Sequence, residues 1–543
     1  MMISLLLTSA AALALSPGEQ HDHSPKLGKL AFETSCSAPA DAEFELGLRW
    51  LHSFEYDRAE KQFLKAADTD PGCAIAHWGV AMANYHPLWA PPTAAELDKG
   101  KAALAKARAA GAKSKREQDY VAAIGAFYDH SERLDHKARA LAYNSAMAQL
   151  RERYPDDDEA AVFYALSQVA AGTLDKDPNF EREKSAAAIL NQVLKEEPDH
   201  PGVAHYLIHS FDYPPLAELA LPAARRYASI APASAHAQHM PSHIFTRLGL
   251  WDEAIRSNRA AQAAAMAHAR ASGMAGTWDQ QLHAMDYLAY AYLQTGRDVD
   301  AQRVLDELQA IKQATSTPTT AYAVSAVPAR VLLERRQWKE AAGFDLPADL
   351  GGLKALTDNK WAIANIRFAN AVGAARSGDP ALARAQAARL AELEQSLVTA
   401  PGAYDWKTQV SIERQIAEAW LAFAEGRKED SVRLMRSAAD LDDATEKHPV
   451  TPGAILPARE QLGELLLELG RPAEAQAEFE ASLKRAPRRL AGLYGAARSA
   501  KLAGNAAAAR RHYGELVKLT QASDGGRAEV QEARSFVAEL AGR

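Results

Sequence analysis

The segment GRPAEAQAEFEASLKRAP, residues 470–487, contains the pattern that decides the fold. Its glycine is followed by alanine at position 475, phenylalanine at 479 and proline at 487. Small residues let two helices approach closely, an aromatic ring fills the space between them, and proline stops a helix. The glycine–alanine spacing recurs at Gly249 with Ala254, at Gly296 with Ala301 and at Gly504 with Ala509. The pattern therefore predicts a chain of repeated helix pairs.

An earlier copy of the pattern starts at Gly47 and continues through Ala59, Phe63 and Ala66 to Pro71. Together these copies resemble the tetratricopeptide repeat (TPR), whose unit is a helix–turn–helix of about 34 residues. The resemblance implies an all-α protein, an α-solenoid of roughly nine or ten TPR-like repeats. Alanine-rich stretches such as 102–112 favour helix as well.

The chain is expected to divide into four segments. We expect a signal peptide at 1–16, an extended N-terminal segment at 17–39, the TPR-like α-solenoid at 40–522 and a C-terminal capping helix at 523–543. The first segment has an apolar run that ends in small residues and is too short to span a bilayer. No other segment is long and apolar enough to be transmembrane, so the expected location is periplasmic or secreted.

The chain has only two cysteines, Cys36 and Cys73. In an oxidising compartment an isolated pair indicates one disulfide. A thiolate metal site or a catalytic thiol is the alternative. The net charge of -7 and the pI of about 6.2 argue against a nucleic-acid partner, which usually leaves a basic footprint.

Two histidine pairs repeat at the period of the predicted fold. His205 and His209 are four residues apart, as are His239 and His243, and each member of the second pair lies 34 residues after its counterpart. Equivalent positions of successive repeats stack side by side. The four imidazoles should therefore form a two-by-two patch on neighbouring helices.

Counting back from the turn glycines places these histidines on the concave groove of the solenoid. The same count adds His236 from one repeat and His283, Asp286 and Tyr290 from the next. Residues four apart share a helix face, and ligands from packed helices can meet at one ion. Imidazole-rich sites with one carboxylate suit Cu, Zn, Fe or Ni. No residue of this group is assigned a catalytic role.

We therefore predict a transition-metal site, with Cu, Zn or Fe as the ion. His205, His209, His239 and His243 are its primary ligands, and His236, His283 and Asp286 form a second tier, of which some orient the ligands. Two alternatives stay open. The imidazoles can serve as hydrogen-bonding groups of a peptide-binding groove, or they can be structural packing.

Four further residues are candidates for substrate binding. Tyr290 and Arg330 occupy groove positions, and Glu460 faces the groove much later in the solenoid. His448 belongs to a loop, because prolines and a glycine follow it at 449–453. If the superhelix curls, this loop folds over the groove as a lid.

Segments 51–54, 70–73, 236–245 and 447–453 also resemble a group of secreted bacterial TPR proteins of unknown function, a resemblance that implies no activity. Pro241 should kink its helix between the two inner histidines, because proline removes a backbone hydrogen bond.

The sequence thus predicts an exported α-solenoid with a histidine-rich transition-metal site in its concave groove. If the site is catalytic, the metal activates water or dioxygen, in a hydrolytic or oxidative reaction on an extended substrate. The groove ligand is a small molecule or a peptide. The alternative is a periplasmic scaffold that binds peptides or proteins without catalysis.

Overall fold

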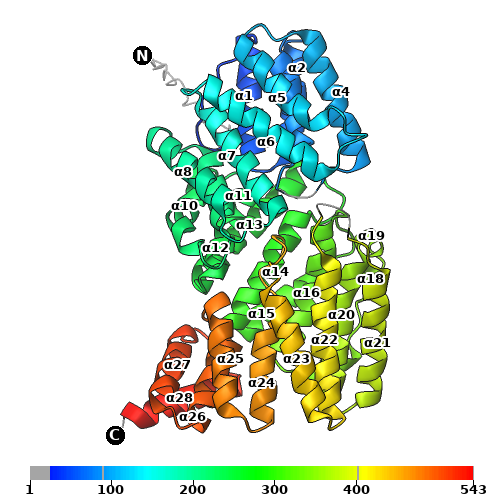
Figure 1. The fold of residues 1–543 in the computed structure, drawn as a ribbon, viewed down its shortest axis with the longest axis vertical. Coiled ribbons are helices and arrows are strands. Elements are labelled where there is room, and N and C mark those ends of the chain that lie inside the picture. Colours follow the sequence, from blue (N-terminus) through cyan, green and yellow to red (C-terminus); the bar gives the residue numbers. More distant parts are fainter. Residues whose placement is uncertain (1–24, 89–90, 400–402, 542–543) are drawn as a thin grey trace, which may run out of the picture.

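The computed structural model describes residues 25–88, 91–399 and 403–541, and the predicted signal peptide lies outside them. Apart from one isolated bridge between Thr277 and Ala314, the regular structure in these ranges is helical. The helices are stacked as antiparallel pairs that follow one another along the chain (Figure 1). The predicted all-α solenoid is confirmed. No helix within these ranges is both long and apolar enough to cross a membrane.

The first part of the solenoid runs from the N-terminal segment to the first histidine pair. Its helices are α1 (Ala38–His52), α2 (Tyr56–Thr69), α3 (Ala74–Ala83), α4 (Ala94–Ala110), α5 (Lys115–Tyr128), α6 (His136–Arg153), α7 (Asp158–Asp175), α8 (Glu181–Glu196) and α9 (Pro201–Phe211).

The middle part contains the other histidines of the predicted site. Its helices are α10 (Ala217–Ile230), α11 (Ala235–His239), α12 (Pro241–Arg247), α13 (Trp251–Ala271), α14 (Asp279–Gln294), α15 (Asp298–Gln309), α16 (Pro318–Glu334), α17 (Trp338–Gly343), α18 (Ala348–Gly351) and α19 (Lys354–Asp358).

The last part completes the solenoid. Its helices are the 3₁₀ turn η1 (Lys360–Ala362), α20 (Ile363–Ser377), α21 (Pro380–Ser396), α22 (Trp406–Ala424), α23 (Lys428–Asp443), α24 (Ala458–Glu468), α25 (Pro472–Arg485), α26 (Leu490–Leu502), α27 (Ala506–Leu519) and α28 (Ala528–Ala541).

The glycine–phenylalanine pattern has the same structural role near both ends of the chain. The ring of Phe63 on α2 lies so close to Gly47 on α1 and Gly79 on α3 that a Cβ on either glycine would overlap it. Phe479 on α25 is enclosed in the same way, by Gly463 on α24 and Gly495 on α26. Each phenylalanine thus packs one helix against the first helices of two successive repeats.

The solenoid curls until its C-terminal helices contact its middle. The indole Nε1 of Trp251 donates to the carbonyl of Arg488 at 2.8 Å, and the Leu490 amide donates to Gln294 at 3.1 Å. Arg527 and Asp298 form an ion pair. In Figure 1 the orange and red helices accordingly lie beside the green ones. This curl covers the concave surface near α14, where the sequence placed part of the site.

The N-terminal segment is held at two places. Its Cys36 is joined to Cys73, the residue that precedes α3. The Lys29 amide donates to the Asp199 carbonyl at 3.0 Å, and the Ala233 amide donates to the Lys26 carbonyl at 3.1 Å. The segment thus links the first repeat to α9 and α10, which border the histidine-bearing helices.

Candidate metal centre

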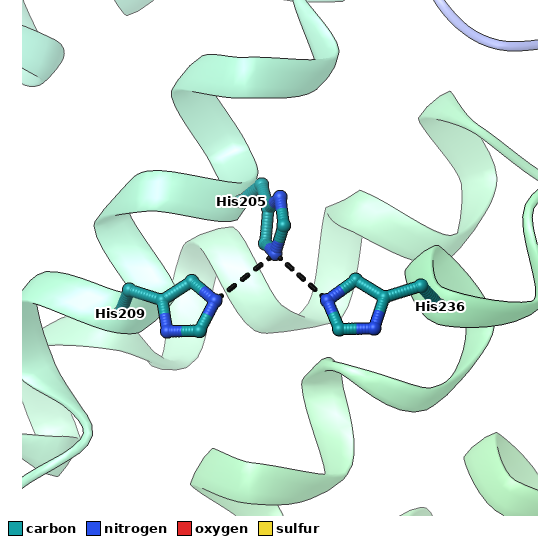
Figure 2. A group of neighbouring side chains, drawn as sticks. All are labelled: His205, His209 and His236. Atoms are coloured by element: carbon teal, nitrogen blue, oxygen red, sulfur yellow. Dashed lines mark hydrogen bonds between the residues drawn. The ribbon is translucent and has the colours of Figure 1, made fainter. Parts of the chain in front are cut away.

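Three histidines from two helices bring their ring nitrogens together. His205 and His209 lie on α9, and His236 lies on α11. The Nε2 atom of His205 is 3.1 Å from the Nε2 of His209 and 3.1 Å from the Nε2 of His236. Figure 2 shows both outer rings pointing their Nε2 atoms at His205. We call these three residues triad A.

The surroundings of triad A fix which nitrogen of His205 is available. Its Nδ1 lies 2.6 Å from the carbonyl oxygen of His52, so Nδ1 carries the proton and donates it. The Nε2 of His205 therefore presents a lone pair to the other two rings. The phenyl ring of Phe54 packs against His209 and His236, with ring centroids 5.4 and 5.7 Å away. Triad A is thus enclosed by an aromatic residue from the first repeat.

A second group, triad B, consists of His239, His243 and His283. His239 ends α11, His243 lies on α12 and His283 lies on α14. The Nε2 atoms of His239 and His243 are 3.0 Å apart, and the rings of His239 and His283 have centroids 4.0 Å apart. One ligand atom from each member lies within 4.8 Å of the others.

Outer hydrogen bonds hold two rings of triad B in the same tautomer. The Asn258 amide nitrogen donates to a helix carbonyl, which leaves its side-chain oxygen facing His239. The Nδ1 of His239 therefore donates to this oxygen at 2.6 Å. His243 Nδ1 donates to the Asp212 carboxylate at 2.9 Å. Both Nε2 atoms therefore present lone pairs to each other. Carboxylate and amide partners of this kind are typical of metal-binding histidines.

Burial keeps these imidazoles neutral. It lowers the pKa of His205, His236, His239 and His283 well below the usual value, and the neighbouring imidazoles lower it further. Burial also lowers the pKa of His243, although its hydrogen bond to Asp212 opposes the shift. Neutral imidazole is the form that binds a metal ion.

The two triads adjoin each other on α11. His236 of triad A and His239 of triad B are three residues apart, with ring centroids 6.4 Å apart. The pKa of His209 falls to about 3, first through burial and then through the charge of His243 in the other triad. The helix is interrupted at Met240, between α11 and α12. This residue directly precedes Pro241, which predicts a kink there.

A third cluster, His52–Glu159–His200, has a different character. The His52 Nε2 and the His200 Nε2 contact the two carboxylate oxygens of Glu159 at 2.9 and 3.0 Å. The His52 Nδ1 contacts the Tyr206 hydroxyl at 2.9 Å, and the His200 Nδ1 accepts from the Gly202 amide at 3.0 Å. Burial raises the pKa of Glu159, but the interactions with both histidines outweigh it and the net pKa is lowered. Every polar side-chain atom of this cluster thus has a partner.

Residues 444–457 cover triad B from far along the chain. The Tyr287 hydroxyl, 3.4 Å from the Nε2 of His243, donates to the Thr451 carbonyl at 3.1 Å. The Arg330 guanidinium donates to the carbonyls of Gly453 and Ala454, both at 2.7 Å. The segment lies over the site, where the sequence predicted a lid. As a result the histidines are buried rather than exposed on an open groove: His205, His236, His239, His243 and His283 are at most 3% exposed.

The structure groups the predicted ligands differently from the sequence. The two-by-two patch of His205, His209, His239 and His243 is divided between two triads. His236 and His283, expected in a supporting tier, each complete one triad. Asp286 lies apart from both, because its carboxylate pairs with Arg330 at 3.2 Å. Burial raises the pKa of Asp286 to about 6 although Arg330 opposes the shift.

The residues expected to bind substrate divide into two groups. Glu460 pairs with Arg489 at 3.0 Å, and Tyr290 accepts a hydrogen bond from Arg489 at 2.6 Å. Arg330 holds the covering segment. These three thus belong to a buried charge network. The His448 ring packs against Trp406, with centroids 5.0 Å apart, beside a cavity that Tyr290, Glu413 and Trp406 also line.

Sequence reasoning missed the residues that orient and enclose the triads. These residues do not recur at the 34-residue spacing that revealed the histidines. They are Asp212, Asn258, Tyr287 and Phe54. Asp212 does begin the unusual DYPPL turn at 212–216, which was the one available signal. The other three contact the triads only through tertiary packing.

Comparisons with known proteins identify no relative. Neither a protein-family model nor a curated protein matches the chain. Among solved structures, the human IFIT1 dimer with m7Gppp-AAAA is 13% identical, with 82% of this chain and 90% of that chain covered and a TM-score of 0.37. The TPR domain of P58(IPK) is 12% identical, with coverage of 93% and 98% and a TM-score of 0.21. Yeast Tom70 is 12% identical, with coverage of 92% and 95% and a TM-score of 0.30. These values transfer no function to this chain.

Proposed function

We propose that this chain is a transition-metal protein that binds one ion in triad A and one in triad B. The observation that carries the proposal is the pair of Nε2 atoms of His239 and His243, 3.0 Å apart. Each ring has already committed its Nδ1 proton, to Asn258 and to Asp212 respectively. Two lone pairs that face each other at this distance repel unless a proton or a cation lies between them.

A metal ion fits this position better than a proton does. Burial lowers the pKa of both His239 and His243, so protonation of either ring is unfavourable. A bound ion would instead use both lone pairs at once. In triad A the Nε2 lone pair of His205 likewise points at two further imidazoles at 3.1 Å, which would be its co-ligands on an ion.

The nitrogen spacing favours ligands on one side of an ion. With metal–nitrogen bonds of about 2.0–2.1 Å, nitrogens 3.0–3.1 Å apart subtend about 90–100° at the metal. Nitrogens at this spacing would lie on one side of the ion and leave the opposite side open. An ion with an open position can activate water or dioxygen, so we propose an enzyme of hydrolytic or oxidative type. Copper, zinc and iron all suit such ligands.

The substrate has to approach through the covering segment. The cavity beside His448 is lined by Thr451, whose carbonyl accepts the Tyr287 hydroxyl that lies next to His243. We propose that a small molecule or a peptide side chain enters this cavity. His448 and Tyr290 contact it there, while Arg330 keeps the segment in position and Glu460 holds Arg489 against Tyr290.

We further propose that the protein is exported to the periplasm or outside the cell. The linked Cys36 and Cys73 are compatible with an oxidising compartment. The proposed segments are those predicted from the sequence: the signal peptide 1–16, the extended segment 17–39, the solenoid 40–522 and the capping segment 523–543. Mass spectrometry of the N-terminus of the exported protein tests the first boundary.

Elemental analysis tests the metal proposal. The protein, produced without a polyhistidine tag, is stripped with a chelator, offered copper, zinc or iron, and dialysed. Two ions per chain are expected for at least one metal. The double variant His239→Ala with His243→Ala should lose one of them. His268→Ala, a histidine outside the three clusters, is the control and should keep both. A wild-type protein without stoichiometric metal would refute the proposal.

A further inference from the structure

Triads A and B share one short helix, and together they surround a single buried region. We infer that they hold a pair of copper ions that act together, reducing one dioxygen molecule between them by two electrons. This inference rests on the proposed function, because it requires that both triads bind metal. It adds the identity of the ion, the cooperation of the two sites and the small molecule on which they act.

The proximity of the triads is the first argument. Helix α11 supplies His236 to triad A and His239 to triad B, one turn apart, with ring centroids 6.4 Å apart. Ions bound at the two groups of nitrogens would therefore be neighbours.

The charge of the surroundings is the second argument. All six ligands are imidazoles, and all but the partly exposed His209 are buried. The nearest carboxylate, Asp212, is already balanced by Arg247 at 2.9 Å and by Lys447 at 3.7 Å. Asp286 is balanced by Arg330. Two divalent ions would thus place four positive charges in a low-dielectric region without an anion to offset them, which is unfavourable.

Copper resolves this difficulty, because among the ions suited to imidazole it is stable in the singly charged state. Two copper(I) ions carry two positive charges. When dioxygen binds, each ion gives up one electron, and the dioxygen becomes a peroxide dianion. The ions then carry four charges and the ligand minus two, so the total stays at plus two. The buried region therefore experiences no net change in charge during the reaction.

The enclosure of the site selects a small reactant. Phe54 packs against triad A, and Tyr287 and residues 444–457 cover triad B. A diatomic molecule can pass between such side chains when they fluctuate, whereas an extended substrate cannot. The Tyr287 hydroxyl lies 3.4 Å from His243 Nε2 and gives its proton to the Thr451 carbonyl, so it helps to close triad B against larger molecules. With two electrons from an external donor such as ascorbate and two protons, the peroxide leaves as hydrogen peroxide and copper(I) is restored.

Copper spectroscopy tests the inference. Metal-free protein is loaded with copper(I) without oxygen and analysed for copper, then exposed to air. X-ray absorption at the copper edge reports the oxidation state, and electron paramagnetic resonance counts unpaired spins. We expect two copper ions per chain, oxidised in air to copper(II), with loss of nearly all the spin signal because the two ions are magnetically coupled.

A one-sided variant provides the matched comparison. His209→Ala should remove the ion of triad A and, when loaded directly with copper(II), hold one copper per chain that shows its full spin signal. His268→Ala should behave as the wild type. Two copper(II) ions with a full spin count, copper that stays monovalent in air, or a protein that binds zinc but no copper would each overturn the inference while leaving the metal proposal intact. No bound metal of any kind would overturn both.

Discussion

The two all-histidine triads and the His52–Glu159–His200 cluster are built from similar residues at similar distances, yet they differ in how their hydrogen-bonding capacity is used. In the third cluster a carboxylate lies between two imidazoles, and each ring nitrogen has a donor or acceptor opposite it. In triads A and B the Nδ1 atoms of His205, His239 and His243 are engaged, and the Nε2 atoms of His239 and His243 point at each other.

This difference separates a structural cluster from a ligand site. A buried polar group is expensive unless it has a partner, so a cluster that is complete by itself stabilises the fold. A cluster whose lone pairs converge without a donor is stable only when something binds between them. The structural cluster and the ligand site adjoin each other in this protein. His52 belongs to the His52–Glu159–His200 cluster, and its backbone carbonyl also orients His205 of triad A.

The largest expected effect comes from the complete cluster. Glu159→Leu leaves His52 and His200 buried without their shared acceptor and should lower the free energy of unfolding by about 3–5 kcal/mol. Chemical denaturation measures the loss, which should be the same with and without metal. Glu132→Leu, at an exposed ion pair with Arg133, is the control and should have little effect. A Glu159 variant as stable as the wild type would show that the cluster is not structural.

The next effect distinguishes the triads. A free metal concentration 100 times the dissociation constant should stabilise the wild type by about 2.7 kcal/mol per site. Thermal unfolding with and without added metal measures this shift. The stabilisation by metal should be roughly halved in the double variant His239→Ala with His243→Ala. In Glu159→Leu it should be as large as in the wild type. An equal shift in the wild type and the double variant would contradict the assignment of triad B.

The outer partner of His243 should have a smaller effect. Asp212→Asn keeps a hydrogen-bond acceptor near the ring but removes the carboxylate charge, so metal affinity at triad B should fall about 10–100-fold. Competition with a chromophoric chelator measures the two affinities separately. Affinity at triad A should stay as it is in the wild type, because its His205 is oriented by a backbone carbonyl. Equal weakening at both triads would mean that Asp212 acts through the fold.

A last effect is a slope of stability with pH in metal-free protein. Burial lowers the pKa of His209 from 6.5 to about 3, so below pH 6.5 the unfolded chain takes up a proton that the folded chain does not. Stability therefore falls as the pH falls, by about 1.4 kcal/mol per pH unit for each such histidine. Glu159, whose folded pKa is lowered, contributes stability that is lost only below its unfolded value of 4.5.

Between pH 6.5 and 4.5 the slope should thus come from the buried histidines, His52 included. The variant His209→Leu should reduce the slope of stability with pH by the contribution of one histidine. The control variant His130→Ala, at an exposed position, should leave the slope as it is in the wild type. Denaturation of metal-free protein at several pH values measures the slope. A His209 variant with the wild-type slope would show that this ring is protonated in the folded protein.

Sequence reasoning recovered what is periodic and missed what is not. The repeat of glycine, alanine and phenylalanine predicted the helix pairs, because close helix packing requires small residues opposite a ring, as Gly47 and Gly79 are opposite Phe63. The spacing of 34 residues predicted that His205, His209, His239 and His243 lie on neighbouring helices. It paired them as a flat patch, however, whereas α11 alone contributes His236 to one triad and His239 to the other.

The contacts between residues 444–457 and the site could not be predicted from the periodicity of the sequence. Residues 444–457 reach Tyr287 and Arg330 only because the solenoid curls, and the degree of curl is set by packing along its whole length. Asp212 and Asn258 were missed for a related reason. Their role depends on which ring nitrogen faces them, and that orientation exists only in the folded protein.

The most direct test of the account is to locate the metal. Crystals of the protein soaked in copper, with diffraction recorded on both sides of the copper absorption edge, show where the ion binds. We expect one anomalous peak among the Nε2 atoms of His205, His209 and His236, one beside His239, His243 and His283, and none at His52–Glu159–His200. A peak at the third cluster, or no peak at either triad, would contradict the central claim that converging lone pairs, rather than histidine clusters in general, form the metal site.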